Sequence, residues 1–312
     1  MKKMNNKSHI EGRIYQNGLK KTVSGPNSAH PGTEFISGNL DIATDNAGIN
    51  IVTVHFTYVT ATTGSGKKNA TFEVLSDIID GKLATVMANG FDAAAMVRID
   101  SAIGLNDFYT DRNGKEELVS AKRNEGGFVH VVTALDEDEK VRSTFDADII
   151  ITEVVVKEAD PEKNLDEKAI IKGAIFDFRN ALLPVEFSVT NPNAIAYYEG
   201  LEASAKNPVF TRVKGRQVSE VVVRQIVEES AFGDAAVREV KNTRKDYVVT
   251  WGAKEPYVWD DEETITAQEL MKAMSDRQTY LATVKQRNDE YKASKNAAPS
   301  AFAAASATEF KF

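Results

Sequence analysis

Short runs of alternating apolar and polar residues, many of them β-branched or aromatic, recur through the first 135 residues. The run 51–59 is the clearest, and Asp45–Gly48 before it has the composition of a hairpin turn, as does Asp111–Gly114 further on. Ser76–Gly81 predicts a short helix that begins at the serine and ends at the glycine. The pattern predicts strands at 10–15, 34–44, 49–60, 70–75, 95–101, 117–122 and 128–134. Such a set favours a small closed barrel.

The same kind of pattern begins again after Pro161. Residues 169–175 repeat the spacing of apolar residues around a glycine that residues 8–14 show. A strand at 185–189, a helix at 193–203 and strands at 208–216, 221–227 and 247–251 are predicted to follow. We therefore expect a second copy of the barrel, with the boundary between the copies near Pro161.

The end of the chain predicts a helix and then a tail. Thr266–Glu269 is a capping-box sequence, and an apolar stripe follows it at Leu270, Met274, Leu281, Val284 and, less regularly, Tyr280. Residues 293–312 are rich in alanine and serine and are expected to stay disordered until they meet a partner. The predicted fold is mostly β, with two tandem barrels of the oligonucleotide-binding type at 1–158 and 166–258, a helix at 264–292 and a tail at 293–312.

Composition narrows the classes of protein that fit. The 312 residues are 42% hydrophobic and 27% charged, which is typical of a globular protein. No run approaches the roughly 18 apolar residues that span a bilayer, and the first residues have no apolar signal region, so we expect a cytoplasmic protein without membrane contact. With no cysteine and four scattered histidines, neither a zinc site nor any other metal or cofactor is expected.

Charge is unevenly distributed along the chain. Lysines and arginines number 38 against 46 aspartates and glutamates, so the formal charge is 38 − 46 = −8. Residues 136–167 hold 12 acidic and four basic groups, so this segment alone accounts for the whole excess. Residues 206–224, 238–245 and the first 21 residues are locally basic. These basic stretches either balance the acidic segment as solvated faces or contact phosphates.

Enzymatic signatures are weak. Gly64–Lys68 has glycines and a lysine like a phosphate loop, but Ala61 stands where the motif requires glycine and Lys68 where it requires serine or threonine. Asp100 with Asp107 or Glu117 offers only a generic acidic pair for a metal nuclease. We expect no enzymatic activity.

Aromatic and basic residues interleave on the predicted strands and hairpins. Bases stack on such rings and phosphates contact the cations when proteins bind single-stranded nucleic acid without sequence preference. Phe56 and Tyr58 are two residues apart, so they are expected to share one sheet face, and Arg212, Lys214 and Arg216 are expected to share another. About half of the rings could instead fill barrel cores. The candidate nucleic-acid-binding residues are Phe56, Tyr58, Lys67, Lys68, Phe72, Phe108, Tyr109, Arg112, Lys122, Arg123, Phe178, Arg179, Phe210, Arg212, Lys214 and Arg216.

The order of motifs in the first 135 residues resembles bacterial and phage single-stranded DNA-binding proteins of the oligonucleotide-binding class. The segments that carry the resemblance are 12–14 (GRI), 34–44, 70–75 (ATFEVL), 97–100 and the hairpin 106–114. The resemblance implies that Phe72 and Phe108 stack on bases. It also implies that Phe310 and Phe312, near the end of the tail, recruit replication or recombination proteins.

Two functions follow as hypotheses. The first is a non-enzymatic protein that coats single-stranded DNA during replication or recombination, encoded by a phage and located in the host cytoplasm. The alternative is a phage structural or virion assembly protein with no role on nucleic acid. The sequence leaves the oligomeric state open, a homo-oligomer included.

Overall fold

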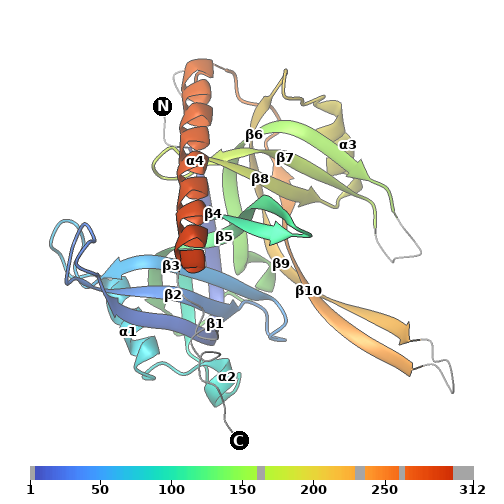
Figure 1. Ribbon diagram of the computed structural model, residues 1–312. Coiled ribbons are helices and arrows are strands. Elements are labelled where there is room, and N and C mark those ends of the chain that lie inside the picture. The colour runs from blue at the N-terminus through green and yellow to red at the C-terminus, as the bar shows by residue number, and fades with distance from the viewer. Residues whose placement is uncertain (1–3, 160–165, 229–235, 260–263, 298–312) are drawn as a thin grey trace, which may run out of the picture.

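The computed structural model describes residues 4–159, 166–228, 236–259 and 264–297 (Figure 1). Its first part contains five strands and two helices. They are β1 (Asn6–Val23), β2 (Glu34–Ala43), β3 (Ile51–Thr60), α1 (Ala70–Ile79), α2 (Val86–Asn89), β4 (Met96–Arg112) and β5 (Lys115–Val131). Their hydrogen-bonding order is β1-β2-β3-β5-β4 and back to β1, so the five strands close into a ring, which we call ring one. Only the β3–β5 pairing is parallel.

The second part has the same order. Its elements, after the short η1 (Glu139–Val141), are β6 (Ser143–Lys157), β7 (Lys168–Phe176), β8 (Leu182–Val189), α3 (Pro192–Gly200), β9 (Val209–Glu228) and β10 (Ala236–Gly252). Their order is β6-β7-β8-β10-β9 and back to β6, and only the β8–β10 pairing is parallel. In this ring, ring two, a helix again follows the third strand. Residues 6–10 of β1 pair with residues 143–147 of β6, which joins the two rings edge to edge.

Alternation along the strands gives each ring its own core. In ring one Leu40, Ile42, Val52 and Val54 point inward, while the residues between them are more exposed. Ring two is filled by a cluster around Phe145 and Phe187, whose ring centroids lie 4.8 Å apart. The expectation of a mostly β fold with a C-terminal helix is confirmed.

Ring two begins earlier than the sequence pattern predicts. Strand β6 lies before Pro161 but pairs with β7 and β9 over most of its length, so the polar stretch after Lys157 connects two paired strands. Residues 169–175 lie on β7, the second strand of their ring, whereas residues 8–14 lie on β1, a first strand. The two segments are similar in sequence pattern, but they do not occupy equivalent strands of the two rings. The domain boundaries remain a prediction.

Residues 70–75, predicted as a strand, form the first part of helix α1. The side chain of Asn69 accepts a hydrogen bond from the backbone N–H of Thr71 at 3.1 Å and so caps the helix. Thr71, Leu75 and Ile78 are buried at helical spacing. The short helix expected at 76–81 is the end of this same helix.

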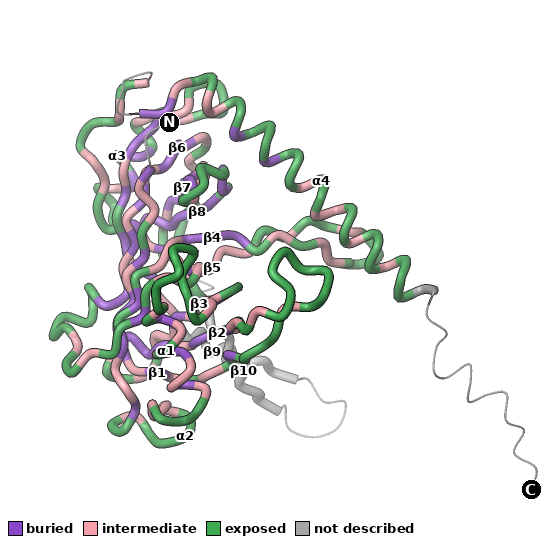
Figure 2. The backbone as a smooth tube through the Cα atoms, turned by 90° about the vertical axis from the view of Figure 1, so that its left-hand side faces the viewer, coloured by how far each residue is buried: buried purple, intermediate pink, exposed green. Residues whose placement is uncertain are grey.

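Helix α4 (Ala267–Ala297) lies along the hairpin of β4 and β5 (Figures 1 and 2). The capping box is present, because Glu269 accepts a hydrogen bond from the N–H of Thr266 at 3.0 Å. The predicted apolar stripe is only partly correct, since Met274 and Tyr280 are exposed and Ala273 and Arg277 are buried instead. In the described part of the chain, no helix combines the length and apolar character needed to span a membrane.

Candidate nucleic-acid interface

The outward face of β2 and β3 in ring one is polar and uncharged over much of its length. Because Leu40 and Val54 point inward, Asn39 and His55 point outward, and the His55 Nδ1 lies 2.7 Å from the Asn39 Oδ1. The Thr53 hydroxyl donates to Asp41 at 2.6 Å in the same way. Cross-strand hydrogen bonds thus hold these groups in place before any ligand arrives.

An aromatic pair stands at the end of this face. The register between β2 and β3 shifts at Ile36 and Gly38, so β3 has one extra residue there and both Thr57 and Tyr58 are exposed. The rings of Phe35 and Tyr58 have centroids 4.5 Å apart, and the Tyr58 hydroxyl lies 3.2 Å from the Ser24 Oγ. With 44% of Tyr58 exposed, the pair offers an ordered ring surface to a base.

A cleft of about 390 Å³ adjoins this face, between ring one and the β9–β10 strands. Asn39, Thr53, His55, Asn106 and Arg123 are among its lining residues, together with Lys245 of β10, whose Nζ donates to the Thr53 hydroxyl at 3.1 Å. Burial lowers the pKa of His55, and the nearby Arg123 lowers it further against the opposing effect of Glu125. The cleft therefore presents hydrogen-bonding groups and cations together.

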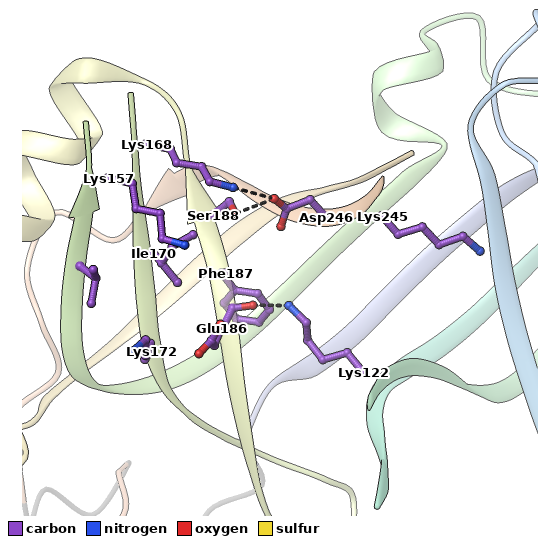
Figure 3. Close-up of a pocket in the computed structure, with 11 residues that line it drawn as sticks. Lys122, Lys157, Lys168, Ile170, Lys172, Glu186, Phe187, Ser188, Lys245 and Asp246 are labelled. Carbon is purple, nitrogen blue, oxygen red and sulfur yellow. Dashed lines mark hydrogen bonds and ion pairs between the residues drawn. The ribbon is translucent and has the colours of Figure 1, made fainter. Parts of the chain in front are cut away.

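A second depression, of about 410 Å³, lies on the outward face of ring two (Figure 3). Inward-pointing Ala169 and Ile171 leave Lys168, Ile170 and Lys172 of β7 on this outward face. Lys157 of β6 stands directly opposite Lys168. We call this depression the lysine pocket; its five lysines are Lys122, Lys157, Lys168, Lys172 and Lys245, against the carboxylates Glu186 and Asp246.

The two depressions are adjacent, because Lys122, Lys245 and Asp246 line both. Lys122 reaches from β5 of ring one to donate a hydrogen bond to the backbone oxygen of Glu186 in ring two. Its Nζ lies 4.8 Å from the ring centroid of Tyr247. Burial lowers the pKa of Lys122, although Asp246 and Glu186 oppose the shift. We call the combined surface the inter-ring groove; it runs from the β2–β3 face to the lysine pocket.

Several predicted residues lie on or near the groove. Lys122 and Arg123 line it, and Tyr58 is exposed on the neighbouring face. Phe108 is 40% exposed on β4 and lies on the same strand face as Asn106, which lines the cleft. Arg112 is exposed at the end of that strand, and Lys67 and Lys68 are exposed in the loop after β3, where Lys68 forms an ion pair with Glu73.

Other predicted residues lie in cores. Phe56 and Phe210 are each 1% exposed, so neither ring is accessible to a base, and we leave both out of the proposed site. The expectation that Phe56 and Tyr58 share a face is wrong, because the extra residue in β3 turns Tyr58 outward. Phe72 is half-buried on α1 and packs against the core of ring one.

The remaining predicted residues lie away from the groove. Arg212, Lys214 and Arg216 do share the outward face of β9, since the residues between them are buried. Arg212 makes a bidentate ion pair with Asp146 at 2.7 and 2.6 Å, and the Lys214 Nζ lies 5.0 Å from the ring centroid of Trp251.

Phe178 and Arg179 pack on each other between β7 and β8. Tyr109 faces helix α4, with the Lys285 Nζ 5.5 Å from its ring centroid. Phe310 and Phe312 lie outside the described residues.

The chain is similar to one protein family in sequence and to known single-stranded DNA binding proteins in structure. The chain matches the YorF family over residues 5–287. It belongs to that family. Two crystal structures of the single-stranded DNA binding protein from Thermus aquaticus are similar at 9% identity and 84% coverage of this chain. The wild-type structure is covered over 98% of its chain with a TM-score of 0.45, and a deletion mutant over 99% with a TM-score of 0.44. No curated protein matches the chain.

Sequence reasoning missed most of the lysine pocket, together with Phe35, His55 and Lys245. The sequence did contain an indication of this pocket. Lys168 and Lys172 are four residues apart, so the two-residue alternation of a strand places both side chains on the same face. The partner strand that brings Lys157 beside them could not be identified without the strand pairing. Among the described residues, no group of three or more histidines and carboxylates is arranged to hold a metal ion.

Proposed function

We propose that the protein binds single-stranded DNA in the inter-ring groove without sequence specificity. The observation that carries this proposal is the continuity of the groove, which brings cations of both rings together and adjoins the β2–β3 face on which Tyr58 is exposed. In oligonucleotide-binding folds, the face of the second and third strands and the adjoining loops bind nucleic acid, and the groove begins on the corresponding face of ring one.

Each part of the groove has a separate role in this account. Lysines and Arg123 contact phosphates, while Tyr58, Phe35 and Phe108 stack on bases. Asn39 and His55 offer hydrogen-bonding groups that suit any base edge. Such contacts favour single strands, whose bases are free to stack on protein rings.

In the cell, this protein would coat single-stranded DNA during replication or recombination of a phage, in the host cytoplasm. It would have no enzymatic activity of its own. Phe310 and Phe312 would recruit partner proteins, as the sequence resemblance implies. Homo-oligomerisation would extend the coat along the strand.

Fluorescence anisotropy with a labelled oligothymidylate tests the proposal. A length of about 30 nucleotides suits two oligonucleotide-binding units. We expect saturable binding that an unlabelled duplex of equal length competes poorly. The double variant Arg123→Gln and Lys245→Gln should bind more weakly. Lys272→Gln should bind like wild type, because Lys272 is an exposed lysine of α4 that forms an ion pair with Asp276. A protein that binds neither single strand nor duplex would contradict the proposal and favour the virion assembly role.

A further inference from the structure

Equivalent faces of the two rings carry different chemistry. The second and third strands are β2 and β3 in ring one and β7 and β8 in ring two. On ring one this face bears Asn39, His55 and the Phe35–Tyr58 pair. On ring two it bears Lys168, Lys172 and Glu186, beside Lys157 of β6. The repeat thus preserves the backbone and changes the groups available to a ligand.

Among the described residues that line the lysine pocket, no ring is placed so that a base could stack on it. The one aromatic residue of that described lining is Phe187, which is 0% exposed and packs against Phe145 in the core. The other lining side chains on β7 and β8 are Lys168, Lys172, Ile170, Glu186 and Ser188. This composition attracts phosphate groups but gives a base no partner of the kind that Tyr58 supplies.

Within the described residues, the positive charge of the pocket is only partly paired: the Lys172 Nζ lies 3.0 Å from a carboxylate oxygen of Glu153, whereas Lys157 and Lys168 face each other. Lys157 and Lys168 are directly opposite each other on neighbouring antiparallel strands, and like charges in that position destabilise a sheet. The Lys168 Nζ lies 3.6 Å from the Asp246 Oδ2. Within the described ranges, Lys157 has no ion-pair partner. A phosphate between the two ammonium groups would remove the repulsion.

We infer that the two rings divide recognition between them: the lysine pocket of ring two binds backbone phosphates whatever base they carry, and the β2–β3 face of ring one stacks the bases. This inference rests on the proposed binding of single-stranded DNA. It predicts that ring two contributes equally to the binding of strands with and without bases.

The test compares an oligothymidylate with an abasic deoxyribose-phosphate strand of equal length, each titrated against the full chain. The triple variant Lys157→Gln, Lys168→Gln and Lys172→Gln should weaken binding of both strands by the same factor, about tenfold or more. Tyr58→Ala should weaken binding of oligothymidylate by about tenfold and leave the abasic strand within twofold of wild type. Lys272→Gln is the matched control for loss of a lysine on an exposed surface.

The division would be overturned if the triple lysine variant lost affinity for the two strands by different factors. It would also be overturned if Tyr58→Ala lost affinity for both strands by the same factor. If the triple variant does not fold, Lys157→Gln alone gives the same comparison, because this side chain has no ion pair to lose within the described ranges. A wild-type protein that binds neither strand would contradict the proposed function itself. If the wild-type protein binds both strands but the variants do not show the predicted losses, only the division between the rings is contradicted.

Discussion

Adjacent residues on β4 have opposite surroundings. Asp107, Tyr109 and Asp111 face helix α4, where they contact Arg277, Lys285 and Lys292. Phe108 points to the other side of the strand, on the face that Asn106 shares with the cleft. The alternation of the strand therefore gives two neighbouring aromatic residues different roles.

Phe108→Ala is expected to weaken binding of oligothymidylate by about 1–3 kcal/mol, because a stacking ring is lost. Tyr109→Ala is the matched control: it removes a ring of similar size that faces α4, so affinity should stay within about 0.5 kcal/mol of wild type. Anisotropy titrations of the two variants at one salt concentration make the comparison. Equal losses would show that Phe108 does not stack on a base.

Affinity for single strands is expected to rise as pH falls below the ordinary histidine pKa of 6.5. Burial lowers the pKa of His55, so its ring is neutral at pH 7 and gains a proton only in more acidic solution. A bound phosphate favours the protonated ring, so binding and protonation reinforce each other. Folding has the opposite dependence: the unfolded chain takes up the proton first, so His55 reduces stability as pH falls below 6.5.

Titrations at about pH 7.5 and about pH 5.5, on either side of the ordinary histidine pKa, measure this effect. In His55→Gln the rise in affinity should disappear or shrink. The other three histidines remain in that variant and control for their own titration. A rise of the same size in the variant would assign the pH dependence to one of them.

At the residue scale, alternation predicted the outward face of β9 correctly, although this face lies away from the groove. Period-two spacing placed Arg212, Lys214 and Arg216 on one face, as the structure has them. It failed at Tyr58, because the extra residue opposite Ser37 depends on how β2 pairs with β3, which the sequence of β3 alone does not encode.

Helix α4 is held to the β4–β5 hairpin by charge more than by apolar contact. Arg277 makes two hydrogen bonds to Asp107, at 2.8 and 2.6 Å, and the side chains are 9% and 1% exposed. Further along, hydrogen bonds from Lys285 and Lys292 lower the pKa of Glu116 to about 2. The helix thereby neutralises one face of a hairpin whose other face continues the groove.

Arg277→Met is expected to destabilise the protein by about 3–5 kcal/mol, because it leaves the buried carboxylate of Asp107 without its cation. Lys272→Gln removes an exposed ion pair on the same helix and should cost at most about 0.5 kcal/mol. Denaturant unfolding of both variants measures the difference. A loss below about 1 kcal/mol for Arg277→Met would mean that the pair does not hold the helix in place.

At the element scale, the sequence identified helix α4 by its capping box but assigned residues 70–75 to a strand. That segment has residues with high strand propensity, and its helical state depends on the cap at Asn69 and on burial of Leu75 and Ile78 against ring one. The inward position of Arg277 was equally hidden, since its partner is about 170 residues away in the chain.

Buried polar contacts hold the rings together. Ser8 of β1 donates a hydrogen bond to the Asn124 Oδ1 at 2.9 Å, and Asn124 donates to the Gln217 Oε1 of β9 at 2.7 Å. The Tyr247 hydroxyl of β10 lies 3.5 Å from Asn124. Because these groups are buried and satisfied by one another, they fix the orientation of the rings and thus the shape of the groove.

At the scale of the whole molecule, the sequence predicted a repeated unit with a boundary near Pro161, whereas the strand β6, which precedes that proline, pairs with β7 and β9. The charge count of the acidic segment 136–167 did not indicate that it contains β6, the strand that joins the two rings. The groove itself could not be predicted, since it depends on residues of β3, β5, β7 and β10 that meet only after both rings have closed.

The salt dependence of single-strand affinity tests the central claim most directly. If Arg123, Lys157, Lys168, Lys172 and Lys245 each contact a phosphate, a plot of log K against log salt concentration should be linear with a slope of about −3 to −4, from about −0.7 per contact on a single strand. Substituting Lys168 and Lys172 with glutamine should reduce the magnitude of that slope by about 1–2. A slope near zero, or one that those substitutions leave unchanged, would contradict binding of the DNA backbone in the inter-ring groove.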